Sequence, residues 1–169
     1  MIIIFTKNKV LIPIYAICEG LCLGGFSAIM ESSYPGIVAN AVFGTFATLF
    51  SMLILYKTKV IQCTDKFRSV VFISTLSVGA VYLVNIIGHF FGYAVPGIND
   101  ASALGIVISL IIIAIAASNL IMDFDFIERG EQQMLSKDYE WYGAFGLMVT
   151  LVWVYIEILK LLMQYANRK

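Results

Sequence analysis

The chain has 169 residues, of which 60% are hydrophobic and only 13% are charged. Water-soluble domains contain nearer half apolar residues and a quarter charged ones, so this composition excludes an ordinary soluble domain. The formal net charge is zero, which gives no reason to expect a nucleic acid as partner.

Long segments without charge predict membrane-spanning helices. Asp, Glu, Lys and Arg are absent between Glu31 and Lys57, between Arg68 and Asp100, and between Asp100 and Asp123. Each gap has room for the roughly 20 apolar residues that a helix needs to cross a bilayer. The alternating pattern of a membrane barrel is absent, and backbone polar groups in lipid then require helices. We therefore predict an all-α polytopic membrane bundle in one transmembrane domain, with about five spans at residues 10–30, 36–56, 68–91, 103–123 and 141–163.

The first predicted span combines a carboxyl group with a face of small residues. Small side chains recur at every fourth position, a spacing that lets helices approach closely in lipid, at Ala16, Gly20, Gly24 and Ala28. Glu19 lies near the middle of the span with no cation within one turn, so we expect it to face the bundle interior. It is either part of an ion pathway or a protonated carboxyl that bonds a neighbouring helix.

The fourth predicted span ends with Asp123 and Asp125. Carboxylates at the C-terminus of a helix oppose its macrodipole, which favours cations there, so we expect other groups to hold these two. The alternative is plain solvation where the helix leaves the membrane.

The last predicted span carries Glu157 among apolar residues. A charged group at the centre of a spanning helix costs about 2.5–3.5 kcal/mol on insertion scales, so this carboxyl needs a reason to be there. One interpretation is a functional group. The other is a local pair with Lys160, three residues on, whose ammonium extends toward the membrane surface.

The sequence predicts neither an enzyme nor a cofactor site. The three cysteines form no CxxC pattern and have no histidine pair nearby, which argues against a disulfide framework or a metal site. Ser27 follows a Gly-x-Ser pattern, but Ile29 breaks the GxSxG motif and the single histidine, His89, is the one available base. We therefore expect a non-enzymatic protein without a cofactor.

The distribution of cations predicts the orientation in the membrane. If the N-terminus is cytoplasmic, that side holds eight cations: Lys7, Lys9, Lys57, Lys59, Lys66, Arg68, Arg129 and Lys137. The other side holds three: Lys160, Arg168 and Lys169. This asymmetry follows the positive-inside rule, and five spans then place the C-terminus outside.

Several motifs in register resemble the bacterial branch of the Bax inhibitor-1 family. They are PIYAICEGLCLGGFS at 13–27, YPGIV at 34–38, AVFGT at 41–45, VYLVN at 81–85, NLIMDFDFIE at 119–128, EWYGAFGL at 140–147 and TLVWVYIEIL at 150–159. The resemblance extends over roughly residues 12 to 163. Each motif alone is weak, but their common order makes the resemblance specific.

This resemblance implies a seven-helix fold in a bacterial plasma membrane. The five predicted spans correspond to its last five, and the apolar residues 1–5 resemble the end of an earlier helix, so we expect the first two helices to be missing from this chain. Some family members behave as pH-sensitive calcium leak channels, in which carboxyls on the sixth and seventh helices share protons and close the pore. By motif, Asp123 and Glu157 match these two carboxyls, with Glu157 where Asp is usual.

The resemblance therefore implies a pH-sensitive cation pathway. We expect Asp123, Glu157, Asp125 and Glu19 to line it, with calcium as a candidate ligand of Asp123 and Glu157. The alternative is a non-conducting protein that binds and modulates other membrane proteins through its small-residue faces. In either case the lipid bilayer is an expected partner.

Overall fold

The computed structural model describes residues 11–91, 102–135 and 137–168. Within these ranges the chain forms five helices and no strand: α2 (Leu11–Ser33), α3 (Ile37–Lys57), α4 (Asp65–Phe90), α5 (Ala103–Gln132) and α6 (Asp138–Ala166). All five are long and apolar enough to cross a membrane. This confirms the predicted all-α membrane bundle, while the helix end predicted at residues 1–5 lies outside the described residues.

Capping groups fix where the helices begin. Gly36 adopts a φ of 86°, a left-handed conformation that glycine tolerates best, and this turn separates α2 from α3. The Glu31 carboxylate accepts hydrogen bonds from the Gly36 and Val38 amides at 2.5 and 3.0 Å, because the first amides of a helix lack partners within it. The hydroxyls of Thr64 and Ser102 cap α4 and α5 in the same way.

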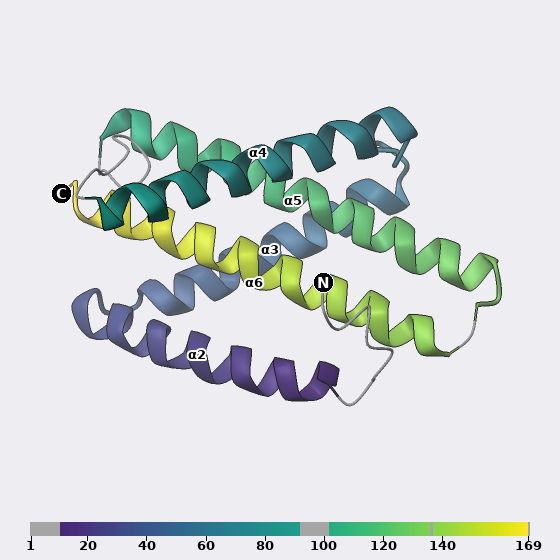
Figure 1. Cartoon of the computed structure of the whole chain (residues 1–169), viewed down its shortest axis with the longest axis horizontal. Helices are drawn as coiled ribbons and strands as arrows, with labels where there is room; N and C mark the ends of the chain where they lie inside the picture. Colours follow the sequence, from purple (N-terminus) through teal and green to yellow (C-terminus); the bar gives the residue numbers. More distant parts are fainter. Residues whose placement is uncertain (1–10, 92–101, 136, 169) are drawn as a thin grey trace.

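Helices α5 and α6 run antiparallel and form the most extensive interface of the bundle (Figure 1). Helix α3 packs against both, and α4 lies along α5. Helix α2 lies at the edge and contacts α6 through a 2.6 Å hydrogen bond between the hydroxyls of Ser27 and Tyr155. The rings of Tyr15 and Phe145 also join these two helices, with centroids 5.3 Å apart. The α5–α6 pair is therefore the centre of the bundle, and the other helices pack around it.

The buried core is small, and the outer faces of the helices are apolar. The core forms two clusters, Ile37, Ala41 and Leu159 in one and Ala116, Leu120 and Val154 in the other. By contrast, Leu21, Phe43 and Phe90 are 73%, 74% and 87% exposed. Water would oppose so much exposed apolar surface, whereas lipid accommodates it, so the surface agrees with a protein embedded in a bilayer.

Helix α5 continues past the predicted end of its span at residue 123 and ends at Gln132. The predicted helix end was therefore wrong, because hydropathy marks where a chain leaves the apolar layer and not where its backbone hydrogen bonds stop. Arg129 lies one turn after Asp125 and pairs with it, which favours the continued helix. Asp123 and Asp125 consequently lie within the helix and not at its C-terminus. The argument that carboxylates oppose the helix macrodipole therefore does not apply to them.

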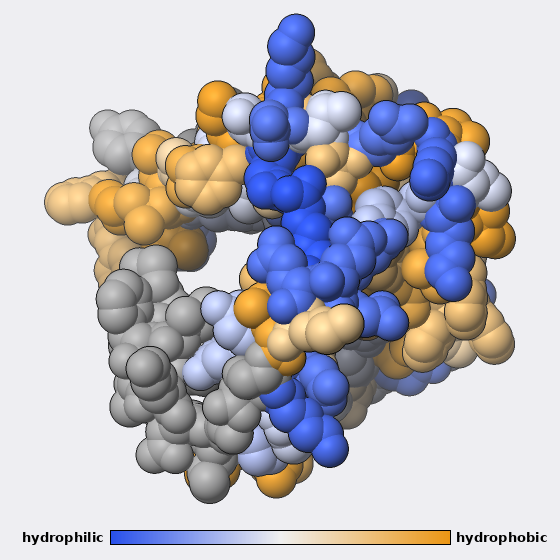
Figure 2. All heavy atoms as spheres, turned by 90° about the vertical axis from the view of Figure 1, so that its right-hand side faces the viewer, coloured by the Kyte–Doolittle hydropathy of each residue, from blue (hydrophilic) through white to orange (hydrophobic). Residues whose placement is uncertain are grey.

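One end of the bundle carries most of the charge. Helices α3 and α5 end there, while α4 and α6 begin there. Hydrophilic side chains gather over this end (Figure 2).

Candidate functional site

Polar side chains follow one face of α6 along most of its length. They recur at spacings of three and four residues, the period of one helix face, and are Thr150, Trp153, Glu157, Lys160 and Gln164. Their partners on α4 and α5 are Tyr82, Ser109 and Asp123. We call these eight residues the polar seam. It passes through the packed interior of the bundle and so offers polar atoms where the surroundings are apolar.

Asp123 lies in the half of the seam that is nearer the charged end of the bundle. Its carboxyl interacts with the Thr150 side chain of α6. A Cβ added to Gly146 would lie 3.3 Å from Asp123 Oδ1, so the missing side chain of Gly146 gives this carboxyl room against α6. The Oδ2 atom is buried and has no hydrogen-bond partner. A carboxylate oxygen in that position has lost water without a full replacement, which is costly in an apolar bundle.

Glu157 is the most buried carboxyl of the seam, with only 3% of its surface exposed. Its Oε1 atom accepts hydrogen bonds from the Tyr82 hydroxyl at 2.6 Å and from Trp153 Nε1 at 3.1 Å. Its Oε2 atom is buried without a hydrogen-bond partner. Tyr82 in turn accepts a hydrogen bond from Lys160 Nζ at 3.3 Å. The carboxyl is thus tied to α4 through Tyr82.

Asp123 and Glu157 lie at different levels of the bundle. Ser109 pairs with Gln164 and Asp123 with Thr150, so antiparallel α5 and α6 place Glu157 level with residue 116. Seven helical residues separate that level from Asp123, which corresponds to roughly 10 Å along the axis. No hydrogen bond joins the two carboxyls within the described ranges, so they do not form the direct proton-sharing contact that the resemblance implied. Their part in pH sensing stays a prediction.

Asp125 lies outside the seam, in a charged cluster at the end of the bundle. It is 8% exposed, and its Oδ2 atom lies 2.5 Å from Arg68 Nη2 and 2.8 Å from Arg129 Nε. Arg68 stands in the first turn of α4, so the cluster joins that turn to α5. The expectation that other groups hold Asp125 is met by these two guanidinium groups, both of which pair with its Oδ2 atom.

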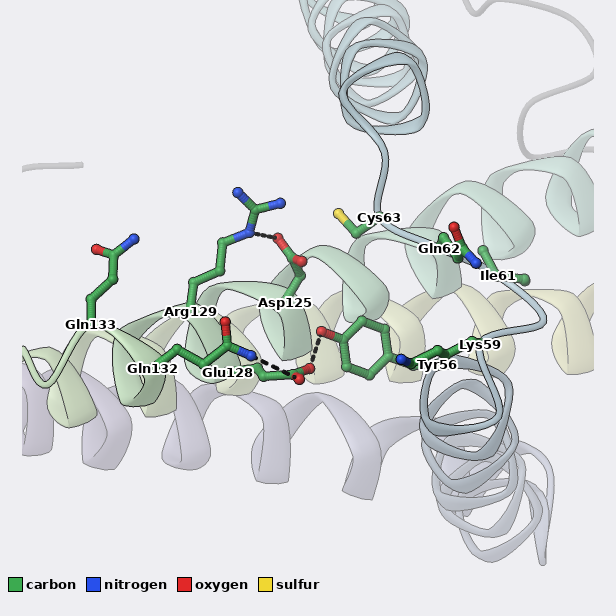
Figure 3. A pocket seen from close by; sticks show the side chains of 10 residues that line it. All are labelled: Tyr56, Lys59, Ile61, Gln62, Cys63, Asp125, Glu128, Arg129, Gln132 and Gln133. Carbon is green, nitrogen blue, oxygen red and sulfur yellow. Dashed lines mark hydrogen bonds and ion pairs between the residues drawn. The ribbon is translucent and has the colours of Figure 1, made fainter.

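A polar pocket of about 490 Å³ lies beside this cluster. Figure 3 shows the side chains of Tyr56 and Glu128 pointing toward each other on one of its walls, where the Tyr56 hydroxyl donates to the Glu128 carboxylate. Gln132 Nε2 donates to the same carboxylate at 3.2 Å. Cys63 also lines the pocket, and burial raises the pKa of its thiol. Acids and cations both line this pocket, so it carries no strong preference for either sign of ligand.

A family model described as "Bax inhibitor 1 like" matches residues 1–167. The chain belongs to the Bax inhibitor 1 like family. The motifs quoted from the sequence therefore identified the family correctly, and together with the five apolar helices they make the chain an integral membrane protein. No curated protein and no solved structure matches the chain significantly.

The carboxyl of the first family motif, Glu19, lies apart from the polar seam. Its Oε1 atom accepts a hydrogen bond from the Tyr15 hydroxyl at 3.1 Å, and its Oε2 atom is buried without a partner. Tyr15 packs on Phe145, so Glu19 stands near the α2–α6 contact. No hydrogen bond joins it to Asp123 or Glu157 in the described part of the chain.

The small-residue face of α2 does not pack within the bundle. A Cβ added to Gly20 or Gly24 would meet no neighbouring atom of the described residues within 4 Å, and Ala28 is exposed, whereas Ala16 is partly buried. Among the described residues no neighbour packs on Gly20 or Gly24, so the close packing predicted for Ala16, Gly20, Gly24 and Ala28 stays a prediction. The spacing identified a face correctly but could not indicate what lies against it.

The sequence analysis did not predict three of the hydrogen-bond partners found at these polar groups. A polar group of α5 or α6 is held by each of Tyr82, Ser109 and Arg68. Nothing in the sequence distinguishes these three from ordinary residues at a helix interface. The three-and-four spacing of Thr150 to Gln164 was the available signal, because it predicts a polar face on the last span. Within the described ranges, no three His, Cys, Asp or Glu side chains group closely enough to hold a metal ion.

Proposed function

We propose that this protein is a pH-sensitive leak pathway for cations, with calcium as the candidate ion, and that it has no enzymatic activity. The observation that supports this proposal is the polar seam, which runs through the packed interior and contains two buried carboxylate oxygens without a partner, on Asp123 and Glu157. We place the protein in a bacterial plasma membrane with its charged end in the cytoplasm, because that end holds six of the described cations: Lys57, Lys59, Lys66, Arg68, Arg129 and Lys137.

The energetic cost of these carboxyls is the reason to assign them a function. An ionisable group inside a bilayer is expensive and is by default a candidate for an ion or proton pathway. Hard cations such as Ca²⁺ take oxygen ligands, and a partly unsatisfied carboxylate supplies one. The seam provides such oxygens at two levels, so an ion could pass from one to the next.

The pH dependence follows from the charge of the seam. At low pH the carboxyls bind protons, and the seam loses the negative charge that attracts cations. As the pH rises, ionised Asp123 and Glu157 repel each other through a medium of low dielectric constant, which loosens the packing of α5 and α6. Flux should therefore increase with pH.

Calcium flux into proteoliposomes that contain an internal indicator tests this proposal. Asp123→Asn and Glu157→Gln should each reduce the flux several-fold and flatten its pH profile, because each removes a titratable oxygen ligand. Asp65→Asn is the matched control, since Asp65 is an exposed acid in the first turn of α4. If Glu157→Gln leaves both the flux and its pH profile unchanged, this mechanism is wrong.

A second candidate function is supported by α2. Its exposed glycines offer a surface on which a helix of another membrane protein could pack closely, as small-residue faces do in lipid. In that case the protein would modulate its partners without conducting ions. Co-purification from native membranes, compared between the wild type and a Gly20→Leu variant, tests this candidate, and a monomeric protein with robust ion flux would count against it.

A further inference from the structure

Lys160 and Glu157 share one hydroxyl group on a neighbouring helix. The Tyr82 hydroxyl donates a hydrogen bond to Glu157 Oε1 at 2.6 Å, and its oxygen accepts a hydrogen bond from Lys160 Nζ at 3.3 Å. The ammonium also lies 5.0 Å from the centroid of the Tyr82 ring, within the range of a cation–π contact. Three side chains from two helices therefore form one bridged unit of carboxylate, hydroxyl and ammonium.

This arrangement differs from a lysine that only extends toward the membrane surface. Such a lysine keeps its ammonium in water while its stem covers apolar surface. Lys160 is partly buried, and its ammonium bonds to a residue that also bonds the most buried carboxyl of the seam. The two charges interact electrostatically across the Tyr82 oxygen, although no direct salt bridge joins them.

The other elements around Glu157 provide no competing cation. Helix α5 is level with it at the buried Ala116, and α3 meets this part of α6 where Gly44 lies against Ile158. Arg68 and Arg129 are both engaged by Asp125 at the charged end of the bundle. Of the described side chains that bond to Glu157 or to Tyr82, Lys160 is the cation.

A buried carboxylate without a counter-charge is strongly unfavourable, so a tethered ammonium nearby changes what the carboxylate can bind. The ammonium and a passing cation are attracted by the same negative charge. The buried Oε2 atom of Glu157 remains without a hydrogen-bond partner and is the position that a cation would use. A cation that binds there has to overcome the repulsion of Lys160 or displace its ammonium from Tyr82.

We propose that Lys160 is a tethered counter-ion of Glu157, held in place by Tyr82, and that its positive charge closes the cation pathway at this level by repelling a permeating ion from Glu157. The proposal rests on the proposed leak function and adds the residue that controls it. The ammonium carries a single positive charge at the end of a flexible side chain, so it can move away from Glu157 while α6 stays in place. Opening then requires movement of one side chain.

Calcium flux in proteoliposomes is the first test. Lys160→Met keeps the length of the stem and removes the charge, and we expect the flux to rise about tenfold, which corresponds to a barrier lower by about 1.4 kcal/mol. Lys160→Arg keeps the charge and should conduct like the wild type. Lys66→Met is the matched control, because Lys66 is an exposed cation at the start of α4. The double variant Glu157→Gln with Lys160→Met should lose the increase.

Thermal unfolding in detergent is the second test, and it does not depend on ion flux. Lys160→Met should lower the melting temperature by several degrees, because it leaves a buried carboxylate without its counter-charge. Adding Glu157→Gln should recover much of that loss, so the two changes should not be additive.

The two tests separate the failure of this inference from the failure of the leak function. If no variant conducts any cation but the stability changes are non-additive, the leak function is wrong and Lys160 is still the counter-ion of Glu157. Additive stability changes overturn the proposal. So does a conducting protein in which Lys160→Met leaves calcium flux unchanged.

Discussion

Burial and Arg68 shift the pKa of the Cys63 thiol in opposite directions. Burial raises the pKa of this thiol, and its hydrogen bond with Arg68 lowers it by less, so the net shift is upward. The thiolate is the form that reacts, so Cys63 should be less reactive near neutral pH than a free cysteine. In a chain with Cys18 and Cys22 changed to Ser, we expect alkylation of Cys63 to reach half its maximal rate above about pH 8.5, the value for a free thiol.

Rates of maleimide labelling across a pH series provide the measurement. Arg68→Gln removes the contact that favours the thiolate and should move the midpoint further upward. A midpoint at or below that of a short cysteine peptide would show that burial does not control this thiol.

Single residues with a high membrane cost were predictable from the sequence, and their partners were not. Asp123 and Glu157 stand out because a carboxyl within an apolar span is expensive. Tyr82 does not, because a tyrosine in a membrane helix costs little and carries no charge. The sequence also suggested a local pair of Glu157 with Lys160, whereas the structure connects them through Tyr82, since α4 brings its hydroxyl between them.

At the scale of the helices, the α5–α6 contact depends on a missing side chain. A Cβ added to Gly143 would lie 2.8 Å from Ile127 Cγ1, closer than atoms can pack, so in Gly143→Ala either the Ile127 side chain or the α5–α6 spacing must shift. We expect this change to destabilise the bundle by roughly 1–3 kcal/mol, as overpacking does in cores. Unfolding in detergent, followed by circular dichroism, would measure it.

Gly20→Ala on α2 is the control for this prediction. A Cβ there meets no described neighbour within 4 Å, and alanine favours a helix more than glycine does. Equal destabilisation by both variants would show that crowding between α5 and α6 does not determine the outcome.

The helices differ in how far the sequence determined them. Charge-free segments located α3, α4 and α5, and apolar stretches with few charged residues located α2 and α6, because an apolar stretch of that length has few alternatives to a spanning helix. The end of α5 was missed because Arg129 pairs with Asp125 one turn earlier and extends the helix beyond the apolar segment. The small-residue face of α2 was predicted from the spacing of its residues. What packs against that face was not predictable, because the spacing describes a single helix and packing requires a second one.

For the molecule as a whole, the orientation in the membrane is directly testable. An alkaline phosphatase fused after Lys169 should be active, because five spans with a cytoplasmic N-terminus place that end outside. Fusion within the segment between α3 and α4, where Lys59 is exposed, should give an inactive enzyme. The reverse pattern would overturn the orientation inferred from the cations.

The arrangement of the five helices was less predictable than their number. Hydropathy assigns residues to lipid or water and says little about which helices meet. Packing in a bilayer depends on shape and on a few polar contacts, such as the Asn119 Nδ2 to Thr75 Oγ1 bond of 2.9 Å between α5 and α4. The polar seam depends on such contacts. Some of its residues were therefore predictable one by one from the sequence, but which of them lie together was not.

The length of α5 affects how the charged end of the bundle meets the bilayer. Its 30 residues measure about 45 Å, while the hydrocarbon layer of a bilayer is about 30 Å thick. The final turns, with Asp125 and Arg129, should accordingly stand among the lipid headgroups. In lipids with longer tails these charges would enter a medium that strengthens their attraction to Arg68, and in shorter ones salt would weaken it. Membrane thickness would then set how firmly α4 is fastened, which hydrogen exchange of α4 in lipids of different tail length would reveal.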